Sequence, residues 1–142
     1  MRIRVLLVDD SDAFLNVEER WLSKDPRVQI VGRAHSGQEA VEHVTRLSPD
    51  LVLMDVTLPD MNGLEAARKI NAKPGAPRIV LVTVETNEEF RTEAEAIKVD
   101  GYVAKAEMSS DLLPLLQRLF PDSQGKRRAR RAPTRSKKRG SR

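Results

Sequence analysis

The sequence has no cysteine, few aromatic residues and no long hydrophobic run. Without cysteine, a disulfide framework and a thiolate metal site are both excluded. The N-terminal stretch MRIRVLLVDD has one short apolar run followed at once by two acids, which fits neither a signal peptide nor a membrane-spanning segment. We therefore expect a cytoplasmic protein without membrane insertion, in a reducing compartment.

The net charge of +4 conceals two segments of opposite sign. Residues 1–120 carry 15 Lys/Arg and 20 Asp/Glu, whereas residues 121–142 carry 10 Lys/Arg and a single acid. The first segment is long enough for one domain with a substantial core. The second, PDSQGKRRARRAPTRSKKRGSR, lacks apolar periodicity. We expect it to be a disordered basic tail.

Five short apolar runs, rich in β-branched residues, alternate with segments of helical period. The runs are apolar throughout rather than alternating, which is typical of strands covered on both faces. This pattern predicts an α/β fold, a flavodoxin-like doubly wound (βα)5 three-layer sandwich with a five-stranded parallel sheet. The expected strands are Ile3–Val8, Val28–Val31, Leu51–Met54, Ile79–Val84 and Gly101–Ala104.

The five helices between and after these strands are predicted from apolar stripes and from their start signals. Ser36-Gly37, Asn62-Gly63 and Asn87 are expected to begin the second, third and fourth helices. In the fifth, Asp111 as N-cap would place Pro114 in the first turn, where its missing N–H costs nothing. The stripes are Phe14/Val17/Trp21, Ala40/Val44/Leu47, Leu64/Ala67/Ile70, Phe90/Ala94/Ile97 and Leu112/Leu116/Leu119.

Polar residues gather where the predicted strands end. Asp9 and Asp10 follow the first strand, Asp55 the third, Thr83 closes the fourth and Lys105 follows the fifth. Ligands of doubly wound sheets bind at this edge. Three converging carboxylates repel each other unless a cation lies among them, and their oxygen ligands favour Mg²⁺. The lysine and the hydroxyl group suit a phosphoryl partner.

An ionised carboxylate at such a site can attack a phosphoryl group and form an acyl phosphate. A metal and a lysine would neutralise the charge that develops. No histidine is needed as a general base, because the nucleophile is already ionised. We therefore expect His35 and His43 to be ordinary surface or helix residues.

The stretch DLVLMDVTLPDMNGLE, with DD upstream and IVLVTV and GYVAK downstream, resembles the response-regulator receiver domain. The likeness is to CheY-like receivers and, in order and spacing, to regulators of the nitrate-response and LuxR type, and it covers residues 3–120. It implies a receiver domain at residues 1–120, with Mg²⁺ as cofactor. The expected partners are a histidine kinase or phosphotransfer protein and an unknown downstream protein. The domain would be a phosphoacceptor switch rather than an enzyme.

The resemblance also implies roles for the acidic residues. Asp55 would be the phosphoacceptor and a metal ligand. Asp10 would bind the metal directly, while Asp9 would hold its water shell. The backbone carbonyl of Thr57 would complete the protein ligands. Asp12 is expected to be a helix-start residue outside the metal site. The alternative for the whole run Asp9-Asp10-Ser11-Asp12 is an ordinary turn and helix cap.

The remaining implied roles belong to the switch. Thr83 would swing toward the phosphoryl group, and Lys105 would pair with a phosphoryl oxygen, or with Asp55 before phosphorylation. Tyr102 would rotate inward as the threonine moves, changing the face built by the fourth helix, fifth strand and fifth helix. The alternatives are simpler: Thr83 would be an ordinary β-branched strand residue, Lys105 a solvated lysine and Tyr102 a half-buried aromatic.

Two residues depart from the family pattern. Val84 stands where Ala or Gly is usual, and its branched side chain is expected to narrow access to Asp55. Ala106 replaces a common proline, so the path into the fifth helix is less determined. Thr57 and Glu85 are further candidates for setting the dephosphorylation rate.

Two other functions fit parts of the sequence. A haloacid-dehalogenase-like phosphatase would use Asp10 in Asp10-Ser11-Asp12, but it leaves Asp55 unexplained and offers only Glu107 and Asp111 as a further acidic pair. A regulator on an inert receiver scaffold could instead contact nucleic acid non-specifically through Lys126–Arg142. No aromatic residue accompanies those charges, so base stacking is not expected. A solubilising extension is the remaining alternative, because the tail is too short for a helix-turn-helix output domain.

Overall fold

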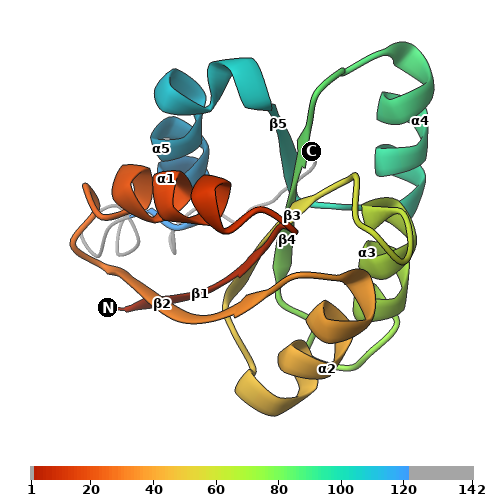
Figure 1. The fold of residues 1–142 in the computed structure, drawn as a ribbon, viewed down its shortest axis with the longest axis horizontal. Coiled ribbons are helices and arrows are strands. Elements are labelled where there is room, and N and C mark those ends of the chain that lie inside the picture. The colour runs from red at the N-terminus through yellow and green to blue at the C-terminus, as the bar shows by residue number, and fades with distance from the viewer. Residues whose placement is uncertain (1, 122–142) are drawn as a thin grey trace, which may run out of the picture.

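A parallel sheet lies between two layers of helices in the computed structural model, which describes residues 2–121 (Figure 1). All strand pairs are parallel, and the order across the sheet is β2-β1-β3-β4-β5. The predicted doubly wound fold is confirmed. The strands are β1 (Ile3–Val8), β2 (Val28–Ala34), β3 (Leu51–Asp55), β4 (Arg78–Thr83) and β5 (Gly101–Ala104).

The helices divide between the two faces of the sheet (Figure 1). One face is covered by α1 (Asp12–Leu22) and α5 (Met108–Leu119), and the other by α2 (Gly37–Leu47), α3 (Gly63–Asn71) and α4 (Glu88–Ile97). Each layer makes its own hydrophobic core with the sheet.

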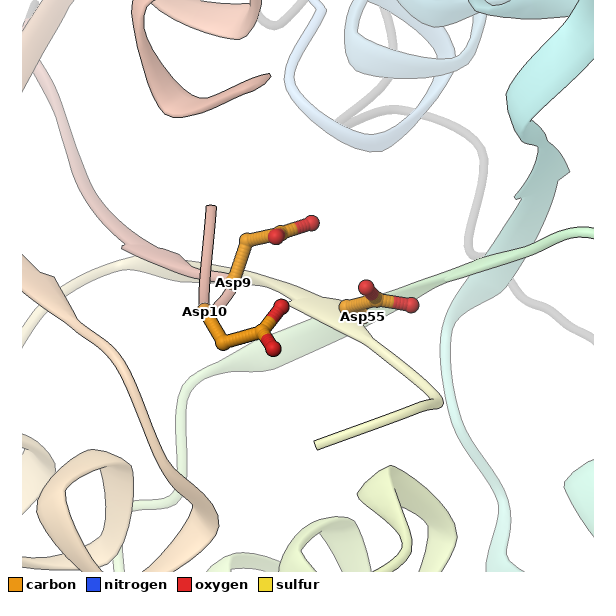
Figure 2. A group of neighbouring side chains, drawn as sticks. All are labelled: Asp9, Asp10 and Asp55. Carbon is orange, nitrogen blue, oxygen red and sulfur yellow. The ribbon is translucent and has the colours of Figure 1, made fainter. Parts of the chain in front are cut away.

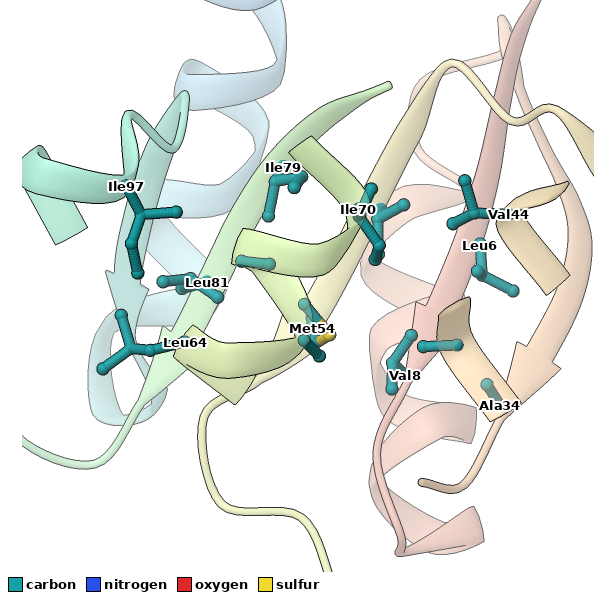
Figure 3. Close-up of a cluster of buried hydrophobic side chains, with 14 of the residues drawn as sticks. Leu6, Val8, Ala34, Val44, Met54, Leu64, Ile70, Ile79, Leu81 and Ile97 are labelled. Carbon is teal, nitrogen blue, oxygen red and sulfur yellow. The ribbon is translucent and has the colours of Figure 1, made fainter. Parts of the chain in front are cut away.

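Strand β1 supplies both cores, as its uninterrupted apolar sequence predicts. Ile3, Val5 and Leu7 pack into the core under α1 and α5, whereas Leu6 and Val8 face the opposite core, seen in Figure 3. All five side chains are almost fully buried. Because successive strand side chains point to opposite faces, this alternation places Asp9, just after β1, on the α1/α5 side of the sheet end.

The helix starts follow the predicted capping residues. Ser36 Oγ accepts from the N–H of Glu39 at 3.1 Å, and Asn87 Oδ1 accepts from the N–H of Phe90 at 2.8 Å. Asn62 Oδ1 accepts from the N–H two residues on, at 2.7 Å. Such caps satisfy N–H groups that have no partner within the helix.

Strand β4 ends one residue earlier than predicted. The Thr83 hydroxyl donates to the carbonyl of Glu85 at 2.9 Å and accepts from the same residue's N–H at 3.3 Å, which turns the chain out of the sheet. Val84 is therefore 72% exposed instead of lying in the strand. Strand β2, in contrast, continues to Ala34, beyond the predicted end at Val31.

The prediction that Asp111 caps the fifth helix is wrong. A 3-10 turn at Lys105–Glu107 runs directly into α5, which begins at Met108 and has Pro114 in its interior. Met108 is fully buried and extends the apolar stripe of the helix by one turn. The proline removes one hydrogen bond, to the exposed Ser110 carbonyl, where water can replace it. Burial of the methionine therefore decides where the helix starts.

The predicted stripe of α1 is displaced by about one residue around the helix. Leu15, Glu18 and Leu22 are buried, whereas Phe14, Val17 and Trp21 are only half-buried. The central position of the buried stripe is a glutamate, so a reading that follows only apolar residues selects the neighbouring stripe.

Within residues 2–121, no helix is both long and apolar enough to cross a membrane. The predicted disordered tail, including Lys126–Arg142, lies outside the described residues.

Candidate functional site

Three carboxylates meet where the strand order reverses, at the ends of β1 and β3 (Figure 2). Oxygens of Asp9, Asp10 and Asp55 all lie within 4.8 Å of one another. Asp9 and Asp55 are buried, while Asp10 is exposed. The predicted convergence of these residues is thus present in the fold.

The buried carboxylate of Asp9 is only partly satisfied. Its Oδ1 accepts from the N–H of Ser11 at 2.8 Å, but its Oδ2 has no hydrogen-bond partner among the described residues. The Lys105 ammonium lies 3.5 Å from this Oδ2. Burial, reinforced by the neighbouring charge of Asp55, raises the pKa of Asp9 to about 6.

Asp55 is held from two sides at the end of β3. Its Oδ1 accepts from the backbone N–H of Thr57 at 3.1 Å, and its Oδ2 accepts from Lys105 Nζ at 3.2 Å. Burial disfavours the charged lysine, but the hydrogen bond and charge of Asp55, with those of Asp9, outweigh it and raise the Lys105 pKa. The predicted pairing of Lys105 with Asp55 is therefore formed in the unmodified site.

The residues at this site fit a hard divalent cation. Three carboxylates bring their oxygens close together, and the buried Asp9 Oδ2 is an acceptor without a hydrogen-bond donor among residues 2–121. An unpaired buried acceptor is costly, and one lysine cannot balance three acids. Oxygen ligands of this kind suit Mg²⁺.

The two predicted switch residues contact groups other than the three acids. The Thr83 hydroxyl is engaged with the backbone of Glu85, as described above. The Tyr102 ring packs edge-on against Phe90, with 5.2 Å between ring centroids, and the residue is 36% exposed.

A groove of about 330 Å³ opens beside Asp55, between the β3–α3 loop and the start of α4. Its walls include Thr57, Thr83, Val84 and Glu85. Val84 is predicted to affect access, Thr57 and Glu85 to affect phosphoryl lifetime, and Thr83 to act in the switch. They thus line one groove, next to the two residues, Val56 and Thr57, that follow Asp55 in the chain.

Asp12 is separate from the acidic cluster. It begins α1, as predicted, and its Oδ1 lies 2.7 Å from Nε2 of His35. That carboxylate raises the His35 pKa by hydrogen bonding to the charged ring. His35 is thus an exposed residue that links the start of α1 to the chain just after β2.

Two acids near the site escaped the sequence reasoning. Asp60, in the loop after β3, accepts from the N–H groups of Gln38 at 2.9 Å and Gly37 at 2.8 Å, and these bonds lower its pKa. It thereby ties the loop after β3 to the start of α2. Glu18 is 1% exposed, and burial together with the charges of Asp9 and Asp55 raises its pKa to about 9.

The sequence contained a signal for only one of these two residues. Leu15 and Leu22 are seven residues apart, and Glu18 lies between them at helical spacing, which marks its burial. The contact of Asp60 depends on how a loop folds back on a helix end, and no local pattern encodes that.

Comparison with known proteins finds relatives of nearly the whole described part of the chain. Residues 5–117 match the family model of the response regulator receiver domain. The chain is 36% identical over 112 residues to the nitrate/nitrite response regulator protein NarL of Escherichia coli K12, covering 79% of this chain and 52% of that protein. It is 38% identical over 96 residues to protein-glutamate methylesterase/protein-glutamine glutaminase 2 of Methanospirillum hungatei, covering 68% and 27%.

A solved structure agrees with these sequence matches. A two-component response regulator of the LuxR family from Aurantimonas sp. SI85-9A1 superposes with a TM-score of 0.79 at 28% identity, covering 94% of this chain and 100% of that one. The chain spans about a quarter to a half of the length of the two curated relatives above. By sequence match, fold and site, this chain belongs to the response regulator receiver domain family of two-component signalling.

Proposed function

We propose that this receiver domain accepts a phosphoryl group on Asp55 and acts as a switch rather than as an enzyme. Receiver domains are typically non-enzymatic switches that bind Mg²⁺ at an acidic cluster, although the Methanospirillum relative is named as a methylesterase. The observation that carries the proposal is the Lys105 ammonium, 3.2 Å from Asp55 Oδ2 and 3.5 Å from Asp9 Oδ2. It is the neutralising charge that phosphoryl transfer to a buried carboxylate requires.

Three residues at the site have separate roles in the phosphoryl transfer. Asp55 attacks the phosphorus atom through a carboxylate oxygen, and the donor's leaving group departs with the electrons of the bond that breaks. Lys105 exchanges its Asp55 contact for a phosphoryl oxygen. The Thr57 N–H holds the other Asp55 oxygen in place during this exchange.

Asp10 and Asp55, with the Thr57 carbonyl, would hold Mg²⁺ directly, and Asp9 would hold the metal's water shell. When bound, the metal offsets the negative charge of the acids and of the incoming phosphate. The raised pKa of Asp9 supports this assignment, because burial first and the neighbouring Asp55 second make its negative charge costly, and a nearby cation would offset that cost.

The phosphorylated domain then signals through its surface. Thr83 leaves its contacts with Glu85 and turns toward the phosphoryl group, and Tyr102 follows inward. The face formed by α4, β5 and α5 changes as a result and binds a downstream protein. Receiver domains work with histidine kinases or phosphotransfer proteins, and we propose one of these as the phosphodonor here.

Asp55→Asn is expected to abolish phosphorylation. The protein is incubated with acetyl phosphate and Mg²⁺, and mass spectrometry should detect one added phosphoryl group that is labile to base. The group should be absent in Asp55→Asn and retained in the control Asp12→Asn, because Asp12 pairs with His35 outside the cluster. Retention in Asp55→Asn, with loss in Asp10→Asn, would instead support the phosphatase chemistry.

Val84→Ala is expected to raise the rate of phosphorylation by acetyl phosphate by about twofold to tenfold, in the range of small steric effects at a site entrance. The branched Val84 side chain lines the groove beside Asp55, and truncating it widens the approach. Single-turnover rates measured by phosphoprotein gel or mass spectrometry test this. An unchanged rate would show that Val84, which is largely exposed, leaves the path open.

A further inference from the structure

The Lys105 ammonium has an aromatic neighbour in addition to its two carboxylates. Nζ lies 4.4 Å from the centroid of the Phe14 ring, in the first turn of α1. A cation within about 6 Å of an aromatic centroid is attracted by the negative face of the ring. The lysine therefore lies between acids at the ends of β1 and β3 and a ring from α1.

The orientation of Phe14 is itself restrained. Its ring meets Trp21 edge-on, with centroids 6.3 Å apart and an interplanar angle of 80°. The two residues are separated by about two helical turns, and both are half-buried at the margin of the α1/α5 core. Edge-to-face packing of this kind favours one ring orientation. The ring face presented to Lys105 is therefore set by α1 and not by the lysine.

We propose that Phe14 is a positioning residue that guides Lys105 from Asp55 to the phosphoryl group. This inference rests on the proposed phosphorylation of Asp55. During the transfer the ammonium must give up its hydrogen bond to Asp55 Oδ2 without leaving the site. A ring face attracts a cation without fixing the direction of its N–H bonds, so the ammonium can turn while its charge stays partly balanced.

A different side chain at this position would behave differently. A carboxylate would compete with the phosphoryl oxygens for the lysine, and a leucine would exclude water but provide no attraction. Lys105 already contacts two carboxylates, that of Asp9 at the end of β1 and that of Asp55 at the end of β3. Phe14 is the uncharged contact in this set, and it holds the ammonium without adding to the negative charge.

The first measurement asks whether the contact exists in solution. In protein labelled with ¹³C at lysine Cε, the Lys105 methylene protons should be shifted upfield by the Phe14 ring current. The shift should disappear in Phe14→Leu and persist in Phe14→Tyr. An ordinary Lys105 shift in the unmodified protein would overturn the proposal without any phosphorylation assay.

The second measurement is a double-mutant cycle on the phosphorylation rate. Phe14→Leu should slow single-turnover phosphorylation by about threefold to tenfold, a range set by ordinary cation–π strengths. Phe14→Tyr should stay within about twofold, since it keeps a ring face. In a Lys105→Met background, Phe14→Leu should have almost no further effect, because the partner that it positions is gone.

Phe120→Leu is the matched control. Its ring lies 5.3 Å from the guanidinium carbon of Arg78, so it removes a similar contact elsewhere in the domain. Thermal unfolding checks that each variant folds, and Phe14→Met replaces Phe14→Leu if the latter does not. An equal slowing with and without Lys105 would mean a structural role only and would overturn the proposal.

The outcomes also separate this inference from the function on which it rests. If Asp55→Asn is inert but Phe14→Leu reacts at the unmodified rate, only the role of Phe14 is refuted. If the unmodified protein takes up no phosphoryl group from small donors or kinases, the phosphoacceptor function fails and the role of Phe14 fails with it.

Discussion

Replacing Glu18 with leucine is expected to stabilise the fold by at least about 3 kcal/mol at pH 7, the cost of protonating Glu18 on folding. Glu18 lies at the centre of the buried stripe of α1, is 1% exposed, and its Oε1 has no hydrogen-bond partner among residues 2–121. Burial comes first among the causes that raise its pKa from 4.5 to about 9, followed by the charges of Asp9 and Asp55. Leucine has a similar volume and removes both the ionisable carboxyl group and its unpaired Oε1.

The stability gained by Glu18→Leu should increase as the pH rises. In the unfolded chain Glu18 loses its proton near pH 4.5, whereas in the folded protein it keeps the proton up to about pH 9. Folding therefore takes up a proton between these values. The penalty is absent below pH 4.5 and grows by about 1.4 kcal/mol per pH unit as the pH rises toward 9. Below pH 4.5, the gain from leucine reduces to the cost of burying a neutral carboxyl group, about 1–3 kcal/mol.

Urea unfolding followed by Trp21 fluorescence at pH 5, 7 and 8.5, with a chelator present, tests this prediction. Glu18→Gln should remove the part of the pH dependence that comes from Glu18 but keep a buried polar group. It therefore separates the cost of protonating Glu18 from the cost of burying a neutral polar side chain. Glu65→Gln, on the exposed side of α3, is the control and should leave the profile unchanged. Parallel profiles for the unmodified protein and Glu18→Leu would show that Glu18 is ionised in the folded state.

The acidic site was predictable from the sequence because strand ends fix it. Once β1, β3 and β5 are recognised as parallel, the residues that follow them must meet at one edge, which brings Asp9, Asp10, Asp55 and Lys105 together. This placement needs no knowledge of loop conformation. The Thr83 hydroxyl is different, because its direction depends on a side-chain rotamer and on the turn made by Glu85.

The features that escaped prediction depend on helix rotation and on long-range packing. A rotation of α1 by about one residue places Glu18 in the core and sets Phe14 against Lys105. The apolar pattern alone chose the other stripe. The start of α5 similarly depends on Met108 filling a space in the core, which outweighs the cost of an internal Pro114. In both cases packing against the neighbouring layer overrides the preference of the local sequence.

Gly63→Ala is expected to destabilise the domain by about 2–3 kcal/mol, in the range for overpacking a rigid site. A Cβ at this position would lie 2.3 Å from the backbone oxygen of Asp55 and 2.8 Å from Cα of Val56. Both are main-chain atoms, and the N–H of Gly63 also donates to the Val56 carbonyl at 2.6 Å. The close approach of α3 to the end of β3 therefore requires a residue without a side chain.

The same substitution should also impair phosphorylation, because relief of the clash must move the backbone of Asp55 or the start of α3. Gly32→Ala is the matched control: its nearest neighbour would be Leu47 Cδ1 at 2.8 Å, the far end of a flexible side chain that can turn aside. Its cost should stay below about 1 kcal/mol. Urea midpoints and single-turnover phosphorylation rates measure both effects.

Helix propensity predicts the opposite sign for Gly63→Ala. Alanine favours a helix over glycine by about 1 kcal/mol, so without the contact to Asp55 the variant would be more stable than the unmodified protein. A stabilised variant with normal phosphorylation would mean that α3 can withdraw from the end of β3 at no cost. A destabilised variant would tie the position of Asp55 to the first residue of α3, so that the helix start and the Asp55 carboxylate are positioned together.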